Sequence, residues 1–384
     1  MNIILIVGVI LIISAWSCKP TRMVGLPILI GFIFIGILIG RAGFKFDNMS
    51  NVNFICDFAL LLIIFTGGFQ INYREAKPVV RVASVLSAAG TIITAFILGA
   101  FAYYVMRLEF YQAMLLGAVI SSTDAASVFS VLRSKQLDLK NNLAPLLEIE
   151  SGSNDPFAFM LTTIFLTLAL GGTQNVLYLL AMQVIVGVVI GIVFARVGQF
   201  LINRLNVDID GLYGVMLCGA AFLIYGVAVQ LGGNGFLAAY IGGVIIGNVK
   251  LVYKGSLSKL YSGISMLMQV LLFIVLGILC VPSEIVKVIW PGLIVALFLI
   301  FIARPLVMFA LMKPFRHPLN EIALVSWAGF RGASSIVFAT YVLIAGLPYS
   351  EYIFSVVFFV CMVSVIIQGT FIAPVAKKLK LIDD

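Results

Sequence analysis

The segment SSTDAAS, residues 121–127, interrupts a run of apolar residues that extends over 110–131. A second polar segment, GFRGASS at residues 329–335, interrupts the apolar run over 321–345. Lipid offers no hydrogen-bond partners, so a polar break in a membrane helix is tolerated only where protein or a water-filled cavity surrounds it. Two such breaks predict an all-α polytopic membrane protein built around interrupted helices.

The composition excludes a soluble domain. Of the 384 residues, 62% are hydrophobic and 10% are charged, and the mean hydropathy is +1.17. Soluble domains carry about 25% charged residues. The net charge of +8 does not indicate nucleic-acid binding, because the basic residues form short clusters between apolar runs. The five cysteines show neither C-x-x-C spacing nor a neighbouring histidine, so no disulfide framework, zinc site or other cofactor is expected.

The apolar runs predict thirteen transmembrane helices at about 20 residues per span, with twelve or fourteen as alternatives. The start of the chain has no basic segment or A-x-A cleavage pattern, which favours a first span over a signal peptide. No linker divides the runs, so residues 1–384 should form one membrane domain. The predicted spans are 2–17, 25–40, 53–69, 79–104, 110–131, 145–169, 175–202, 211–229, 235–249, 263–281, 286–311, 321–345 and 351–376.

The distribution of Lys and Arg predicts the orientation. Alternate connections, starting after the first run, contain 19 of the 24 basic residues, and the other connections contain 4. Cytoplasmic loops carry the excess of basic residues. We therefore expect a multi-pass protein of the cell (plasma or inner) membrane, with the N-terminus outside and the C-terminus in the cytoplasm. The remaining basic residue, Arg331, lies inside a run.

The two polar breaks lie seven spans apart, which gives them opposite orientations in the membrane. This offset predicts two inverted six-helix repeats, 1–169 and 211–376, joined by a linker helix at 175–202. The two discontinuous helices should cross near the midplane and form a binding site there.

The densest polar cluster of the chain is LEIESGSNDP, residues 147–156. Ser151 and Asp155 share one helix face, and Pro156 cannot donate to the carbonyl of Gly152. A carboxylate, a hydroxyl and a free carbonyl are hard oxygen ligands, and they predict an alkali-cation site at Asp155. Burial disfavours the charged carboxylate, so protons should compete with the cation. The alternative is a carboxylate held in a structural ion pair.

Other buried polar residues are expected to support this site. Asp124 should neutralise the positive N-termini of the crossed helices, and Arg331 their negative C-termini. Thr123 and Asn154 are expected to join Asp155 and Ser151 in binding the ion, and Glu150 could pair with Arg331. The serines of the two breaks fit close helix packing as well as ion binding: Ser121, Ser122, Ser334 and Ser335.

Further features have structural interpretations. Asp57 and Glu148 lie near predicted span ends and fit the membrane interface. Three G-x-x-x-G motifs, at 36–40, 187–191 and 243–247, predict helix contacts, with dimerisation as an alternative. The single histidine, His317, lies in a basic loop and is not expected to be catalytic.

Several motifs together resemble the monovalent cation:proton antiporter-1 family, the NhaP-type exchangers. They are TD at 123–124, ESGSNDP at 150–156, GFLAAY at 235–240 with GN at 247–248, and WAGFRGA at 327–333. The resemblance covers essentially the whole chain, and ESGSNDP is most similar to the potassium/proton branch. It implies a thirteen-helix fold in which a dimeric scaffold carries a mobile core, with core helices at about 79–169 and 286–376.

The resemblance also implies roles for single residues. Asp155 would bind the ion and the proton, Ser151 and the Thr123 region would assist, and Glu150 and Arg331 would hold the core together. The chain has Thr66 in the FTGG segment at 65–68, where many members have an acid. Members of the potassium/proton branch often carry a nucleotide-binding region after the last helix. We expect a short member or a truncated chain, since the sequence stops at Asp384.

The leading hypothesis is alternating-access exchange of a monovalent cation for a proton at Asp155, with K⁺ favoured and Na⁺ possible. The expected physiological role is pH homeostasis. Because Asn154 stands where a second acid could titrate, exchange should be electroneutral. The alternatives are a Na⁺(Li⁺)/H⁺ antiporter of the same family and a passive cation channel, although no T-V-G-Y-G filter is present. No enzymatic activity is expected. The expected partners are the cation, the proton, lipid and a second copy of the chain, without nucleic acid.

Overall fold

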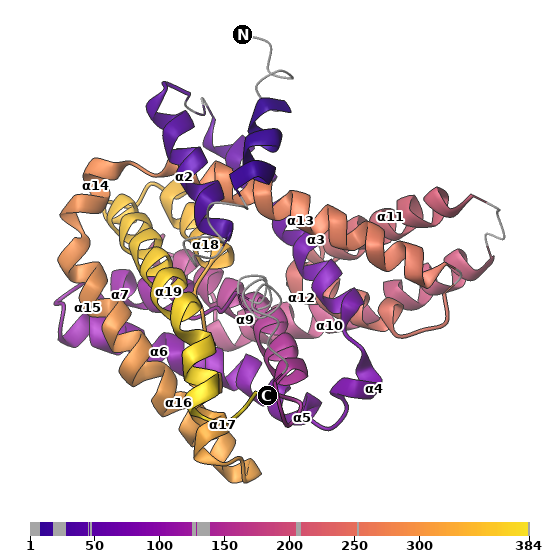
Figure 1. Cartoon of the computed structure of the whole chain (residues 1–384). Helices are drawn as coiled ribbons and strands as arrows, with labels where there is room; N and C mark the ends of the chain where they lie inside the picture. Colours follow the sequence, from indigo (N-terminus) through magenta and orange to yellow (C-terminus); the bar gives the residue numbers. More distant parts are fainter. Residues whose placement is uncertain are drawn as a thin grey trace.

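A computed structural model describes residues 8–17, 28–44, 46, 48–124, 128, 139–204, 209–251 and 253–382. In this part of the chain the elements are helices, apart from one isolated bridge between Leu139 and Ile382 (Figure 1). Seven helices are long and apolar enough to cross a membrane, and shorter apolar helices accompany them. The prediction of a multi-pass, all-helical membrane protein is confirmed.

The helices follow the apolar runs closely. After a helix at Gly8–Ser17, the first part of the chain forms α2 (Ile28–Arg41), α3 (Met49–Gln70), α4 (Tyr73–Ala76), α5 (Val80–Val85), the π-helix η1 (Leu86–Gly90), α6 (Thr91–Tyr104), α7 (Phe110–Ile120) and α9 (Leu143–Ala169). The next four helices are α10 (Val176–Arg204), α11 (Asp210–Gln230), α12 (Gly235–Gly247) and α13 (Lys254–Leu279). The chain continues through α14 (Pro282–Lys287), α15 (Ile289–Phe298), the π-helix η2 (Leu299–Ala303), α16 (Arg304–Met312), the 3₁₀ turn η3 (Lys313–Phe315), α17 (Leu319–Trp327), α18 (Ala333–Ile344) and α19 (Ser350–Lys378).

One boundary of the sequence prediction is wrong. α13 begins at Lys254, whereas the predicted run begins at 263. The first two turns of the helix carry exposed polar residues, including Ser256 and Lys259. A boundary drawn from hydropathy therefore misses the part of α13 that precedes its apolar residues.

Both predicted helix breaks are present. α7 ends at Ile120, α17 ends at Trp327, and five non-helical residues separate α17 from the start of α18 at Ala333. The two non-helical segments meet, because the backbone N–H of Asp124 donates to the carbonyl of Phe330 at 2.8 Å. Within the first predicted break and its run, residues 125–127 and 129–131 lie outside the described residues.

Glycines bring several helices into backbone contact. A Cβ on Gly36 of α2 would lie 2.8 Å from Cα of Gly277 on α13, and a Cβ on Gly191 of α10 would lie 2.8 Å from the Ala238 carbonyl of α12. A Cβ on Gly247 of α12 would lie 2.8 Å from Cα of Phe69 on α3. Each of the three G-x-x-x-G motifs thus faces another helix of the same chain, which confirms their prediction as helix contacts.

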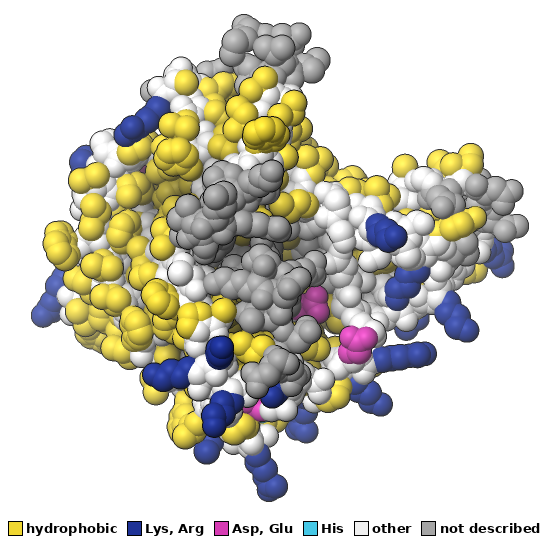
Figure 2. Space-filling model, in the orientation of Figure 1, with side chains coloured by type: hydrophobic (Ala, Val, Ile, Leu, Met, Phe, Trp, Pro, Cys, Tyr) yellow, Lys and Arg dark blue, Asp and Glu magenta, His cyan; other side chains and the backbone are white. Residues whose placement is uncertain are grey.

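The surface reflects the composition. Figure 2 shows hydrophobic side chains over the flank formed by α14, α15, α16 and α19, as expected for a lipid-facing surface. Lys and Arg side chains concentrate along the lower edge of the same view, where α4 and the turn between α16 and α17 lie in Figure 1. Most of the basic side chains visible on this face therefore lie at one end of the helices.

Candidate functional site

Asp155 lies in the middle of α9, at the level where the broken helices cross. Its side chain is 8% exposed, and its Oδ1 accepts a short hydrogen bond from the hydroxyl of Ser122, just after α7. The Ser122 hydroxyl lies 3.0 Å from the hydroxyl of Ser334 in the first turn of α18. Residues from both broken helices therefore meet at this carboxylate.

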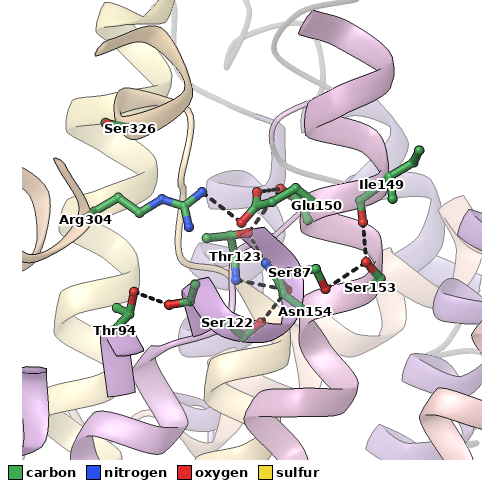
Figure 3. Close-up of polar contacts among 12 residues, drawn as sticks. Ser87, Thr94, Ser122, Thr123, Ile149, Glu150, Ser153, Asn154, Arg304 and Ser326 are labelled. Atoms are coloured by element: carbon green, nitrogen blue, oxygen red, sulfur yellow. Dashed lines mark hydrogen bonds and ion pairs between the residues drawn. The ribbon is translucent and has the colours of Figure 1, made fainter. Parts of the chain in front are cut away.

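Asn154 fixes the first break beside Asp155. Its Oδ1 accepts from the backbone N–H of Thr123 at 3.3 Å, and its Nδ2 donates to Thr123 Oγ1. Thr123 Oγ1 in turn donates to Ser151 Oγ at 3.1 Å. Figure 3 shows Ser122, Thr123 and Asn154 gathered below Glu150. The structure thus brings together Asp155, Ser151, Thr123 and Asn154, the four residues predicted for ion binding.

Glu150 is paired with Arg304 and not with Arg331. Arg304 Nη2 lies 2.9 Å from Glu150 Oε1, and the two side chains are 2% and 0% exposed (Figure 3). Glu150 Oε2 also accepts from the hydroxyl of Ser151 at 3.1 Å. The expected pairing with Arg331 is wrong because Arg304, counted from sequence among the cytoplasmic basic residues, is buried. It directly follows the π-helix η2, whose extra residue changes the face on which the following side chains project.

Arg331 lies in the second break and is fully buried. Among the described residues, its Nε and both Nη atoms have no hydrogen-bond partner. Its backbone N–H donates to Ser364 Oγ of α19 at 2.9 Å. Gln368, one turn further along α19, donates to the carbonyl of Trp327 at 2.7 Å. α19 therefore satisfies backbone groups that the break exposes, while a role of Arg331 in neutralising helix C-termini stays a prediction.

Asp124 lies at the N-terminus of α18. Its Oδ2 accepts from the backbone N–H of Ala333, the first residue of that helix, at 3.4 Å. A carboxylate at this position stabilises the positive end of a helix dipole. This is the geometry expected if Asp124 has the architectural role predicted for it.

Gly332 leaves the space that Asp124 occupies. A Cβ on Gly332 would lie 2.5 Å from both Cβ and Cγ of Asp124. We expect Gly332→Ala to destabilise the fold by roughly 1–3 kcal/mol, the usual range for overpacking, and to lower the melting temperature of the detergent-solubilised protein. The control is Gly219→Ala on α11, where a Cβ would meet no atom within 4 Å. Equal melting temperatures for the two variants would contradict this explanation.

Further polar residues around Asp155 were not singled out from sequence. Ser87 of η1 accepts from Ser153 Oγ at 2.8 Å, and Asn234, the N-cap of α12, donates to the carbonyl of Pro156 at 2.7 Å. These contacts join residues 66 and 78 positions apart in the chain. These two contacts could not be predicted from the spacing of residues along the sequence. Among the described residues, no group of three His, Cys, Asp or Glu side chains is arranged to hold a metal ion.

Comparison with known proteins decides the family. The family described as "Sodium/hydrogen exchanger, transmembrane" matches residues 8–378. The chain belongs to the sodium/hydrogen exchanger family. The exchanger is 36% identical, over 98% of its length, to the K(+)/H(+) antiporter NhaP of Alkalimonas amylolytica, and it spans 67% of that relative. It is 32% identical, over 99% of its length, to the K(+)/H(+) antiporter NhaP2 of Shewanella oneidensis, and again spans 67%.

The fold of the exchanger is similar to that of a solved structure. The sodium proton antiporter MjNhaP1 from Methanocaldococcus jannaschii matches with a TM-score of 0.88 and 24% identity, over 98% of both chains. The family assignment makes the exchanger a monovalent cation/proton antiporter, and it confirms the predictions of the family and of a transporter that is not an enzyme. The roles of the single site residues are predictions that these comparisons do not test.

Proposed function

We propose that the exchanger moves one monovalent cation against one proton by alternating access at Asp155, with K⁺ favoured over Na⁺ and Li⁺. The supporting observation is the buried Asp155 carboxylate, which faces hydroxyls at the crossing of two broken helices. None of the ion pairs between described residues includes Asp155. This favours an exchangeable carboxylate over the structural ion pair left open by the sequence. Similarity to the K(+)/H(+) antiporters NhaP and NhaP2 supports K⁺ as the cation.

The charges of the site support electroneutral exchange. Five buried charged residues lie around the crossing, namely Asp124, Glu150, Asp155, Arg304 and Arg331. With Asp155 ionised and the others charged, this set has a net charge of −1. One proton or one monovalent cation makes the set neutral, so the loaded site carries the same charge in both directions. Burying an uncompensated charge in the membrane is costly, which favours movement of the site only when it is loaded.

Repeated features support the proposed thirteen-helix inverted repeat. In the first half of the chain, the π-helix η1 lies between α5 and α6, and the break follows after α7. In the second half, the π-helix η2 lies between α15 and α16, and the break follows after α17. Pro156 lies inside α9 and Pro374 inside α19, two long helices that come later in the chain than the first and the second break, respectively. We assign the repeats to 1–169 and 211–376 with 175–202 as linker.

The division into core and scaffold is part of the same proposal. The five buried charges lie within the proposed core helices at 79–169 and 286–376. The remaining helices, joined by the glycine contacts, would form a scaffold that dimerises. The concentration of basic side chains at one end of the molecule is compatible with a cytoplasmic C-terminus and an external N-terminus (Figure 2).

Reconstitution tests the proposal. Proteoliposomes holding an imposed pH gradient are pulsed separately with K⁺, Na⁺ and Li⁺, while an internal pH dye and a potential-sensitive dye are recorded. We expect saturable collapse of the pH gradient, strongest with K⁺, and no membrane potential. Protein-free liposomes are the control. Absence of a response to every cation would overturn the function, and a potential generated by exchange would overturn electroneutrality. Flux of thousands of ions per millisecond would indicate a channel.

A further inference from the structure

Aromatic side chains cover one side of the Asp155 site. Phe159 follows Asp155 by four residues on α9, and Phe338 follows Ser334 by four residues on α18, so each ring lies one turn beyond a site residue. The two ring centroids are 5.5 Å apart. The Phe159 ring also contacts Phe236 of α12, with centroids 4.9 Å apart. These three rings, Phe159, Phe236 and Phe338, form an aromatic layer one helical turn beyond Asp155 and Ser334.

A second carboxylate lies on the other side of this layer. The ring of Tyr341, three residues beyond Phe338 on α18, lies 5.2 Å from the Phe159 ring. The Tyr341 hydroxyl donates to Asp57 Oδ2 at 2.5 Å. Asp57 lies two turns into α3 and not at its end, and its Oδ1 is buried without a hydrogen-bond partner among the described residues. The interfacial position expected for Asp57 from the sequence is therefore wrong.

Further oxygen atoms lie on the helix turns next to this second carboxylate and its partner Tyr341. One turn before Asp57, Asn53 Oδ1 accepts from the hydroxyl of Thr340 at 2.8 Å. Asp57, Asn53, Thr340 and Tyr341 thus place a carboxylate, an amide oxygen and two hydroxyls at the contact of α3 with α18. These are the hard oxygen ligands that alkali cations prefer, and they repeat the chemistry found at Asp155.

The exposure of Asp57 and the charges around it both fit a cation site. Asn53, Asp57, Phe159 and Tyr341 are half-buried, whereas Asp155 and the Phe338 ring are buried. Asp57 is therefore more exposed than Asp155. The titratable groups that interact electrostatically with Asp57 are its hydrogen-bond partner Tyr341 on α18, Cys56 on α3 and Tyr225 on α11. None of them is a cation, and no ion pair between described residues includes Asp57.

We propose that Asp57, held by Tyr341, is a second binding site for the monovalent cation and the proton, at the mouth of the route that leads from one membrane face to Asp155. The aromatic layer of Phe159, Phe236 and Phe338 separates the two carboxylates and closes this route in the conformation described. An ion that enters from this face is first neutralised at Asp57 and passes to Asp155 when the rings separate. The inference rests on the proposed function, because it assigns a route for the same exchange.

The test measures exchange from each face separately. Right-side-out and everted membrane vesicles carrying wild-type protein or Asp57→Asn are titrated with K⁺ and with Na⁺. We expect the variant to raise the KM for the cation about tenfold from one face only, the factor that corresponds to losing about 1.4 kcal/mol of binding. Asp57→Glu keeps the charge and should restore most of the affinity. Glu109→Gln, which removes an exposed acid between α6 and α7, is the matched control and should leave both faces unchanged.

The outcomes separate this inference from the proposed function. A wild-type chain that exchanges no cation would overturn the proposed function, and this inference with it. An active wild-type with unchanged kinetics in Asp57→Asn would overturn only the second site. A KM raised equally from both faces would also overturn the second site. Such a result would indicate a general folding defect, because a folding defect affects exchange from both faces alike. A KM raised from one face and restored by Asp57→Glu supports it.

Discussion

Asp155→Asn is expected to reduce cation/proton exchange to the level of protein-free liposomes while leaving the fold intact. Asparagine has nearly the shape of aspartate, and its carbonyl can still accept the hydrogen bond from Ser122. The asparagine amide has no negative charge, so it can neither exchange a proton near neutral pH nor neutralise a bound cation. The measurement is the collapse of an imposed pH gradient on addition of K⁺, together with the melting temperature of the purified variant.

The matched control removes a carboxylate that lies outside the site. Glu284 forms an exposed ion pair with Lys287 at 2.7 Å, and exposed pairs contribute about 0–1 kcal/mol. Glu284→Gln should therefore exchange at the wild-type rate with an unchanged melting temperature. An Asp155→Asn protein that exchanges as fast as wild type would show that the carboxylate is structural, and the transport site would have to lie elsewhere.

Arg304→Met is expected to cause the largest loss of stability. It removes the partner of Glu150, which lies 2.9 Å from Arg304 and is fully buried. Breaking a buried ion pair on one side typically costs 3–5 kcal/mol, because the remaining charge is left without a partner in a low dielectric. The free energy of unfolding in mixed detergent micelles, measured by denaturant titration, should fall by about this amount. Arg196→Met is the control, since Arg196 is exposed on the long apolar helix α10.

A double variant separates lost pairing from lost packing. Replacing both members, as Arg304→Met with Glu150→Leu, removes the unpaired charge and keeps apolar volume in the core. Hydrophobic replacement of a whole buried pair is often neutral or stabilising. The double variant should therefore recover more than half of the stability lost in Arg304→Met. If it is less stable than the single variant, the pair contributes through packing and not through charge compensation.

The helices and both breaks could be predicted because their signals are local. Apolar runs are long, and the polar segments around Thr123 and Arg331 interrupt them visibly. The partner of Glu150 could not be predicted in this way. Arg304 lies inside the predicted span 286–311 but was counted from sequence with the basic residues of a cytoplasmic connection. Only the π-helix before it and the folded core show that it is buried.

Asp57 was misplaced for a related reason. Its distance from the predicted end of a span suggested the interface, but α3 begins four residues earlier than the predicted run. Its contact with Tyr341 joins residues 284 positions apart. Asp155, in contrast, stands in the densest polar cluster, so its burial could be anticipated from residues close to it in the chain. The hydroxyl that contacts its carboxylate belongs to Ser122, which is 33 positions away.

The backbone contacts at Gly36, Gly191 and Gly247 affect how an alignment of related sequences should be interpreted. At these positions even a methyl group would overlap a neighbouring helix, so natural selection removes substitutions there as strictly as at an ion ligand. Invariant columns in such an alignment would therefore mix residues that carry chemistry with residues that have no side chain at all. The polar invariant columns would contain the residues that bind the transported ion together with structural residues such as the Glu150–Arg304 pair.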